Sequence, residues 1–244
     1  MVKTDSFELA MITKGDENST KLAILIPGRL DTKDYAHNIS HIDYLSTKGY
    51  YALSFDPPGT WDSPGGIELY TTTNNIKAVD ELIEHLGNKP TLLMGHSRGG
   101  TIAMLAGIKN PFVTHFVSVF SNYAAPVPPD PERIVNGKLI ELRDLPPGAS
   151  RTEEKKRFEL PMSYFEDGAK YNALDGLSTC TKPKLFFYGE RDTENDPKNI
   201  KKAFEVAAEP KVMHGIDSEH DYRLHSDKID EVNSFLGEFL DSTK

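Results

Sequence analysis

The sequence predicts an α/β fold, in which helices cover both faces of a mostly parallel central sheet. Apolar runs typical of strands alternate with segments of helical spacing along most of the chain. The run over 22–26 is apolar throughout, as expected for a parallel strand buried on both faces. The 244 residues are enough for one domain with a sizeable core, and a single cysteine rules out a disulfide framework.

The elements of the first half follow from these patterns. Residues 6–13 have the mixed polarity of an edge strand, and the spacing over 35–48 predicts a helix that ends at Gly49. The stripe Ile76, Val79, Leu82, Ile83 and Leu86 predicts an amphipathic helix over 73–86. Further strands are expected over 50–55, 92–94 and 113–120, with a buried helix over 101–106.

The pattern is interrupted between residues 122 and 182. This stretch opens with four prolines between positions 126 and 131, and its charged segment 151–159 reads as a helix. Strand and helix then alternate again, with strands expected over 184–188 and 211–216 and helices over 197–208 and 229–240. We therefore expect a core domain formed by 1–121 and 183–244, with 122–182 inserted as a small cap.

Composition limits the partners. The net charge of −9 argues against nucleic acid and against anionic membranes, and no apolar run reaches the ~20 residues of a membrane helix. The N-terminus has no apolar segment typical of a signal peptide, and Cys180 fits a reducing compartment. We expect a cytoplasmic protein, monomeric or homodimeric, that binds a small molecule.

A Gly-x-Ser-x-Gly motif stands between an apolar strand and a helix, at Gly95, Ser97 and Gly99. In that context the motif predicts a nucleophile elbow, a strained turn that exposes the serine hydroxyl. The two glycines have no Cβ to clash with the crowded chain on either side. By itself the motif is of modest specificity, because an ordinary glycine-rich turn between a strand and a helix has the same form.

A serine nucleophile needs a base and a carboxylate that orients it. Asp192 follows the strand over 184–188, and His220 follows the strand over 211–216, so both belong at the edge of the sheet that carries Ser97. The order Ser97, Asp192, His220 is the order in nucleophile-elbow hydrolases. For the acid, the alternative is that Asp192 only shapes a turn and Asp56 takes its place in the triad. For the base, the alternatives to His220 are His214 and His225.

An oxyanion hole needs two backbone N–H groups. One is expected from Arg98, directly after the nucleophile, and the other from Arg29 in the loop after the strand over 22–26. The Arg29 side chain is expected to pair with a carboxylate of the protein, although it could lean toward an acidic group of the substrate. Four further residues are expected to line the substrate pocket: Leu30, Trp61, Met162 and Tyr164.

With these motifs the chain resembles the α/β-hydrolase superfamily, in its serine esterase and lipase-like branch, from about Leu22 to Leu240. Residues 56–63 also resemble the Asp-x-x-Gly-x-Gly-x-Ser segment of that family, with Trp61 in place of the second glycine. Pro27-Gly28 stands where many members have His-Gly, and the N-terminus is short for the family's full antiparallel edge. Members with an aspartate nucleophile are excluded by Ser97.

The expected activity is hydrolysis of carboxylic esters with small to medium acyl groups, through an acyl-enzyme on Ser97. No metal and no organic cofactor is expected, since the sequence lacks His-Glu-x-x-His and Gly-x-Gly-x-x-Gly. An acyltransferase, perhydrolase, peptidase or C–C hydrolase would use the same triad. A non-catalytic binding protein of the same fold is the alternative from another class, and a complete triad speaks against it.

Overall fold

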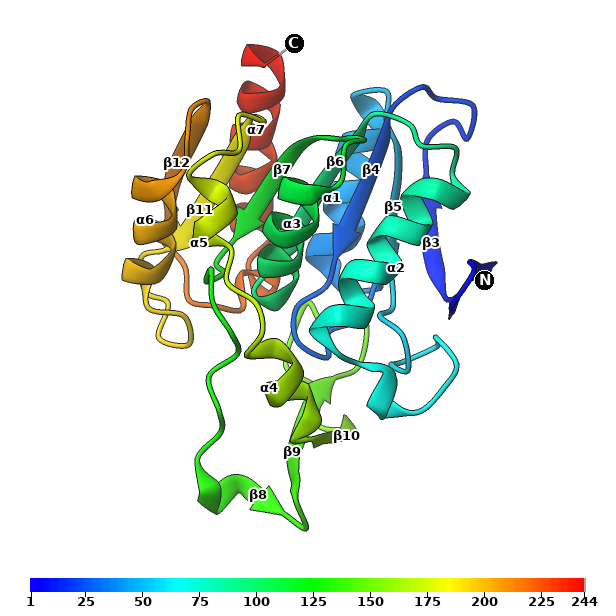
Figure 1. Cartoon of the computed structure of the whole chain (residues 1–244), viewed down its shortest axis with the longest axis vertical. Coiled ribbons are helices and arrows are strands. Elements are labelled where there is room, and N and C mark those ends of the chain that lie inside the picture. The colour runs from blue at the N-terminus through cyan, green and yellow to red at the C-terminus, as the bar shows by residue number, and fades with distance from the viewer. Residues whose placement is uncertain (244) are drawn as a thin grey trace.

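A seven-stranded sheet forms the centre of the computed structural model, which describes residues 1–243 (Figure 1). All of its neighbouring strands are parallel except the last pair, β5 and β3, which is antiparallel. From one edge to the other the strands are β12 (Lys211–Ile216), β11 (Lys184–Gly189), β7 (Val113–Val119), β6 (Thr91–His96), β4 (Leu22–Ile26), β5 (Tyr51–Phe55) and β3 (Met11–Lys14). The mostly parallel sheet that the sequence predicts is confirmed.

Helices cover both faces of the sheet. One face packs against α1 (Ala36–Thr47) and α7 (Ser226–Ser242), and the other against α2 (Thr72–His85), α3 (Arg98–Lys109) and α6 (Pro197–Val206). Figure 1 shows the second set in front of the sheet and the first set behind it. Because β4 is buried along its whole length between these two layers, every one of its residues is apolar.

Only one N-terminal strand joins the central sheet. β1 (Val2–Lys3) and β2 (Glu8–Leu9) pair with each other instead, and β3 alone forms the antiparallel edge. Short 3-10 helices lie at Ile67–Leu69, Pro131–Arg133 and Tyr222–Leu224. Across residues 1–243, every helix is too short or too polar to cross a lipid bilayer.

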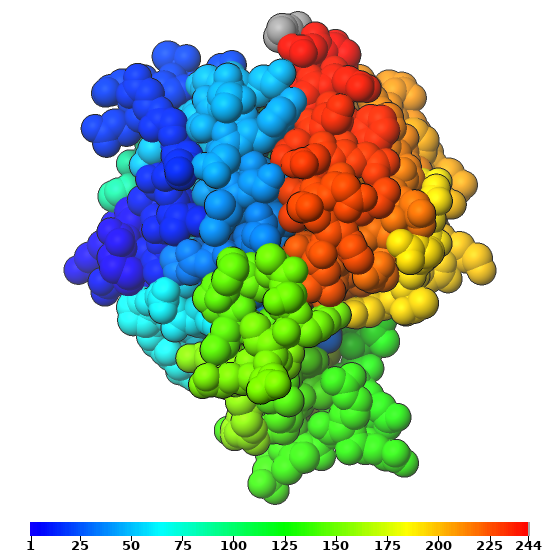
Figure 2. Space-filling model, turned by 180° about the vertical axis from the view of Figure 1, so that it is seen from behind, coloured from blue at the N-terminus to red at the C-terminus, as the bar shows by residue number. Residues whose placement is uncertain are grey.

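The segment 122–182 has its own small sheet. β8 (Ile134–Val135), β9 (Lys138–Asp144) and β10 (Lys155–Pro161) are antiparallel in the order β10-β9-β8, and two short helices follow, α4 (Ser163–Gly168) and α5 (Leu174–Leu177). Figure 2 shows the green part of this segment projecting from one end of the core. We call residues 122–182 the cap.

The helix expected over 151–159 is wrong, because most of that segment belongs to strand β10. Phe158 and Leu160 are buried while Arg157 and Glu159 between and beside them are more exposed, which is the two-residue alternation of a strand. Of the charges that suggested a solvated helix, Arg157 and Glu159 pair with each other on the exposed face of the hairpin. A turn at Asn136-Gly137, with positive φ at both residues, joins β8 to β9.

Candidate active site

Ser97 lies in a strained turn between β6 and α3. Its φ of 52° and ψ of −122° are unusual for a residue with a side chain, and its N–H donates to Val119 O on β7 at 2.8 Å. A Cβ on Gly95 would meet Gly99 C at 2.2 Å, and one on Gly99 would meet Ile26 O at 2.0 Å. The two glycines are therefore required by close backbone approach, and the turn presents the serine hydroxyl at the end of α3.

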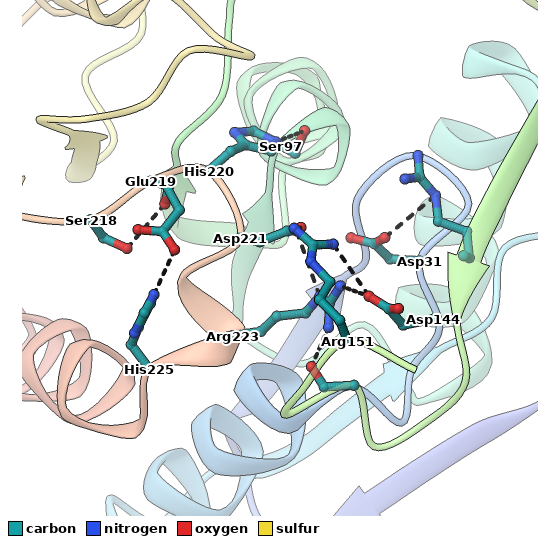
Figure 3. Close-up of polar contacts among 12 residues, drawn as sticks. Asp31, Ser97, Asp144, Arg151, Ser218, Glu219, His220, Asp221, Arg223 and His225 are labelled. Carbon is teal, nitrogen blue, oxygen red and sulfur yellow. Dashed lines mark hydrogen bonds and ion pairs between the residues drawn. The ribbon is translucent and has the colours of Figure 1, made fainter. Parts of the chain in front are cut away.

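The structure brings Ser97, His220 and Asp192 together. His220 Nε2 lies 2.9 Å from Ser97 Oγ (Figure 3). On the other side of the ring, His220 Nδ1 lies 2.8 Å from Asp192 Oδ2. Asp192 also accepts hydrogen bonds from the backbone N–H groups of Glu194 and Asn195, each at 2.9 Å. Asp192 and His220 each occupy a loop directly after a strand, β11 and β12 respectively.

Burial and pairing act in opposite directions on the two ionisable groups. Burial favours the neutral form of Asp192, but the hydrogen bonds and charge of His220 outweigh it and hold the Asp192 pKa below its ordinary value. Burial likewise disfavours a charged His220, yet the hydrogen bond to Asp192 and its negative charge raise the His220 pKa above 6.5. The arrangement thus stabilises an imidazolium beside the serine.

The alternative acid and bases have other roles. Asp56 is fully buried and accepts hydrogen bonds from Thr32 and from the backbone and side chain of Lys33. His214 stacks on Phe235 with ring centres 3.9 Å apart. His225 lies 2.6 Å from Glu219, and Figure 3 shows its ring pointing to that carboxylate, apart from Ser97.

The loop after β4 lies beside the nucleophile. Arg29 and Arg98 both line the cavity at Ser97. Leu30 N–H donates to Tyr70 Oη at 3.1 Å, whereas the N–H groups of Arg29 and Arg98 donate to no acceptor within residues 1–243. Two unpartnered backbone N–H groups at the cavity of a serine nucleophile are what an oxyanion site requires. The Arg29 side chain pairs with Glu141 at 3.0 Å.

A cavity of about 200 Å³ opens above Ser97 and His220. Its wall combines the core with the cap, and most of it is polar or charged. The residues that line it, besides the triad members, are Arg29, Asp31, His96, Arg98, Thr101, Asn122, Pro126, Val127, Arg143, Arg151, Tyr164, Glu194, Asn195 and Asp221. The sequence reasoning identified few of these, because the cap residues among them have no recognisable motif.

Of the four residues expected to line the pocket, the structure places Tyr164 on the cavity wall. Leu30, Trp61 and Met162 instead pack into a hydrophobic cluster between the core and the cap, together with Tyr70, Leu139, Phe158, Leu160 and Phe165. Trp61 Nε1 donates to Leu30 O at 2.9 Å within this cluster. These three side chains support the wall from behind and do not reach the cavity.

The sheet order and the strand–turn–helix at Ser97 are those of the α/β-hydrolase fold. A family model described as alpha/beta hydrolase fold matches residues 23–139. The chain has the α/β-hydrolase fold, as the resemblance to that superfamily predicts.

Among known proteins, the chain is 26% identical over 147 residues to the mitochondrial palmitoyl-protein thioesterase ABHD10 of Bos taurus, covering 59% of this chain and 44% of that protein. It is 24% identical over 217 residues to the lysophosphatidylserine lipase ABHD12 of Danio rerio, covering 83% of this chain and 51% of that protein. The chain thus spans about half the length of the curated relatives it matches.

Solved structures share the fold along the whole chain. The alpha/beta hydrolase domain-containing protein 10 from mouse superimposes with a TM-score of 0.77 at 19% identity, covering 100% of this chain and 98% of that one. The monoacylglycerol lipase of Paleococcus ferrophilus superimposes with a TM-score of 0.76 at 20% identity, covering 97% of this chain and 100% of that one. At these identities the likeness concerns the fold alone.

Proposed function

We propose that the protein is a serine hydrolase that cleaves carboxylic esters of small to medium acyl groups. The observation that carries this is the continuous hydrogen-bonded chain from Ser97 Oγ through His220 to Asp192, at 2.9 and 2.8 Å. A serine hydroxyl becomes an effective nucleophile when a base within this distance takes its proton. The thioesterase and lipase names of the relatives agree with this chemistry.

The geometry supports the following sequence. Ser97 Oγ attacks the ester carbonyl while His220 Nε2 takes its proton, and the oxyanion forms against the N–H groups of Arg29 and Arg98. His220 then donates that proton to the departing alkoxide, which leaves an acyl group on Ser97. A water molecule loses a proton to His220 and attacks the acyl carbonyl. The bond between the acyl carbon and Ser97 Oγ then breaks, His220 returns the proton to Ser97 Oγ, and the carboxylic acid is released. Asp192 keeps Nδ1 of His220 protonated and stabilises the imidazolium throughout.

The cavity favours a short substrate. A long alkyl chain gains its binding free energy from contact with apolar surface, and only Pro126, Val127 and Tyr164 provide such surface here. Charged groups in the wall would lose water without gaining a partner if an apolar chain covered them. A sixteen-carbon acyl group such as that in the name of the ABHD10 relatives is therefore a poor match.

The test is Ser97→Ala with 4-nitrophenyl acetate and a fluorophosphonate probe. The wild type should hydrolyse the ester and carry the label on Ser97, and the variant should do neither while its melting temperature stays near that of the wild type. The residual rate of the variant should be no higher than an oxyanion site provides, roughly 10³-fold above water. Activity of the variant near the wild-type level would contradict the proposal.

A further inference from the structure

One part of the cavity wall is rich in cationic side chains. It is formed by the loop after β4, strand β9, the loop between β9 and β10, and the segment after His220. Arg29, Arg143 and Arg151 line the cavity there, together with the carboxylates Asp31 and Asp221. Around them, outside the cavity lining, are the cations Arg133, Lys155 and Arg223 and the carboxylates Glu141 and Asp144, which form ion pairs with this group. In a protein with a net charge of −9, six cations against four carboxylates at one place is a local excess of positive charge.

Most of these charges already have partners. Asp144 accepts hydrogen bonds from Arg223 and Lys155 and from Thr152 N–H. Arg151 Nη2 lies 2.5 Å from Asp221 and its Nη1 lies 3.3 Å from Asp144, as the dashed lines in Figure 3 show. These ion pairs close the wall and hold the cap against the core.

Among the cations that line the cavity, Arg143 on β9 is the exception. Its guanidinium donates no hydrogen bond to any residue within 1–243. The nearest acceptors are Asp31, 3.9 Å from Nε, and Glu141, 3.8 Å from Nη2, and both distances exceed that of a hydrogen bond. Its Nε is buried, while the side chain as a whole is 24% exposed and lines the cavity that contains Ser97.

The two neighbouring carboxylates, Asp31 and Glu141, do not accept hydrogen bonds from the Arg143 guanidinium. Glu141 directs Oε1 to Arg29 at 3.0 Å, and Asp31 directs Oδ2 toward His96 at 3.7 Å. An arginine held in a partly desolvated wall with unused N–H groups is costly unless something binds it. Its planar fork matches a carboxylate, which accepts two parallel hydrogen bonds from it.

We propose that Arg143 is the binding site for an anionic group of the substrate, so that the esters cleaved at Ser97 carry a carboxylate or an equivalent monoanion. This inference rests on the proposed function, because it names the substrate class of that same site. The anion would add the negative charge that this wall lacks. It would also account for a cavity with so little apolar surface.

The experiment compares esters of equal length with and without the charge. For the acyl side, monoethyl glutarate and monoethyl adipate are matched with ethyl pentanoate and ethyl hexanoate. For the alcohol side, O-butyrylglycolate is matched with propyl butyrate. Released acid is titrated at constant pH for the wild type, Arg143→Gln and Arg143→Lys.

In the wild type, kcat/KM should be higher for the anionic member of at least one pair, and the pair that shows it tells which end of the substrate reaches Arg143. Arg143→Gln should lose about 10- to 100-fold more on that anionic ester than on its neutral match, the range expected for hydrogen bonds to a charged group. Arg143→Lys should recover part of the preference, since it keeps the charge but not the fork. The preference should also weaken as salt is raised.

Arg157→Gln is the matched control. Arg157 lies on the neighbouring strand β10, pairs with Glu159 on the outer face and does not line the cavity. This variant should keep both the activity and the preference. Equal losses on charged and neutral esters in Arg143→Gln, or no preference in the wild type, would overturn the inference and leave Arg143 as a structural link between cap and core.

A binding measurement separates this inference from the proposed function. If no ester in the panel is hydrolysed, the proposed function fails, and calorimetry with glutarate on the Ser97→Ala protein decides the inference alone. Saturable binding of glutarate that is lost when Arg143→Gln is added supports the anion site. No binding to the Ser97→Ala protein, or binding that Arg143→Gln leaves unchanged, contradicts it.

Discussion

The side chain of His96 supports the backbone of the residue that acts as the base. His96 Nε2 lies 3.0 Å from the carbonyl oxygen of His220, so this nitrogen is the donor, and the two rings are 4.8 Å apart. His96 directly precedes Ser97, which means that the nucleophile turn and the loop carrying the base are joined by a hydrogen bond. The histidine before the nucleophile is therefore a positioning residue.

Removing this donor should slow the reaction. His96→Leu should lower kcat/KM by about 10- to 100-fold, because a small displacement of the base from the serine has effects of that size. His96→Gln, which keeps a donor of similar reach, should recover part of the loss. Equal activity of His96→Leu and the wild type would show that the His220 loop holds its position without this contact.

Replacing His220 and His225 one at a time identifies the base. His220→Ala should lose several orders of magnitude in kcat, because within residues 1–243 no other side chain is hydrogen-bonded to Ser97 Oγ. His225→Ala should lose little, since its ring contacts only Glu219. Initial rates on 4-nitrophenyl acetate measure both, and the opposite ranking would assign the base to His225.

The activity should have a characteristic dependence on pH. His220 must be neutral to accept the serine proton, and its pKa is raised above 6.5, so kcat/KM should fall as the pH drops through a value above 6.5. Asp192→Asn removes the negative charge that raises this pKa. The variant should show its acid limb at lower pH and a kcat lower by about 10⁴-fold. If the acid limb of the kcat/KM profile lies at the same pH in Asp192→Asn as in the wild type, a group other than His220 controls it.

Tyr164 and Met162 together test whether the cap contacts the acyl group of the substrate. Tyr164 lines the cavity and stacks on Tyr70 with ring centres 5.3 Å apart, whereas Met162 packs behind the wall. Tyr164→Leu should therefore change the ranking of ethyl esters by acyl length, and Met162→Leu should leave it unchanged. A changed ranking in Met162→Leu alone would place the acyl group outside this cavity.

The core could be read from the sequence because its signals are local. Continuous apolar strands, the elbow motif and polar residues directly after strand ends each depend on a few neighbouring residues, as at Ser97, Asp192 and His220. Parallel strands bring their carboxyl ends to one edge of the sheet, so polar residues directly after those strands are expected to lie together in the site. That is why residues far apart in the chain could be grouped.

The cap could not be read in the same way. The dipeptide Asn136-Gly137 is a usable signal for the first hairpin of the cap, but the charges around Arg157 obscure its third strand, β10. The position of Arg143 on the cavity wall depends on how this small sheet sits over the core, which no local pattern encodes. Leu30, Trp61 and Met162 were expected at the cavity because they are apolar and nearby, and they pack into the cluster behind it instead.

The order of the triad along the chain has a consequence for synthesis. His220 follows Ser97 by 123 residues and belongs to the loop after β12, the last strand and an edge of the sheet. A growing polypeptide therefore contains its nucleophile long before it contains the base that activates it. Until His220 has been synthesised and folded beside Ser97, the serine has no base to take its proton and remains a weakly nucleophilic alcohol.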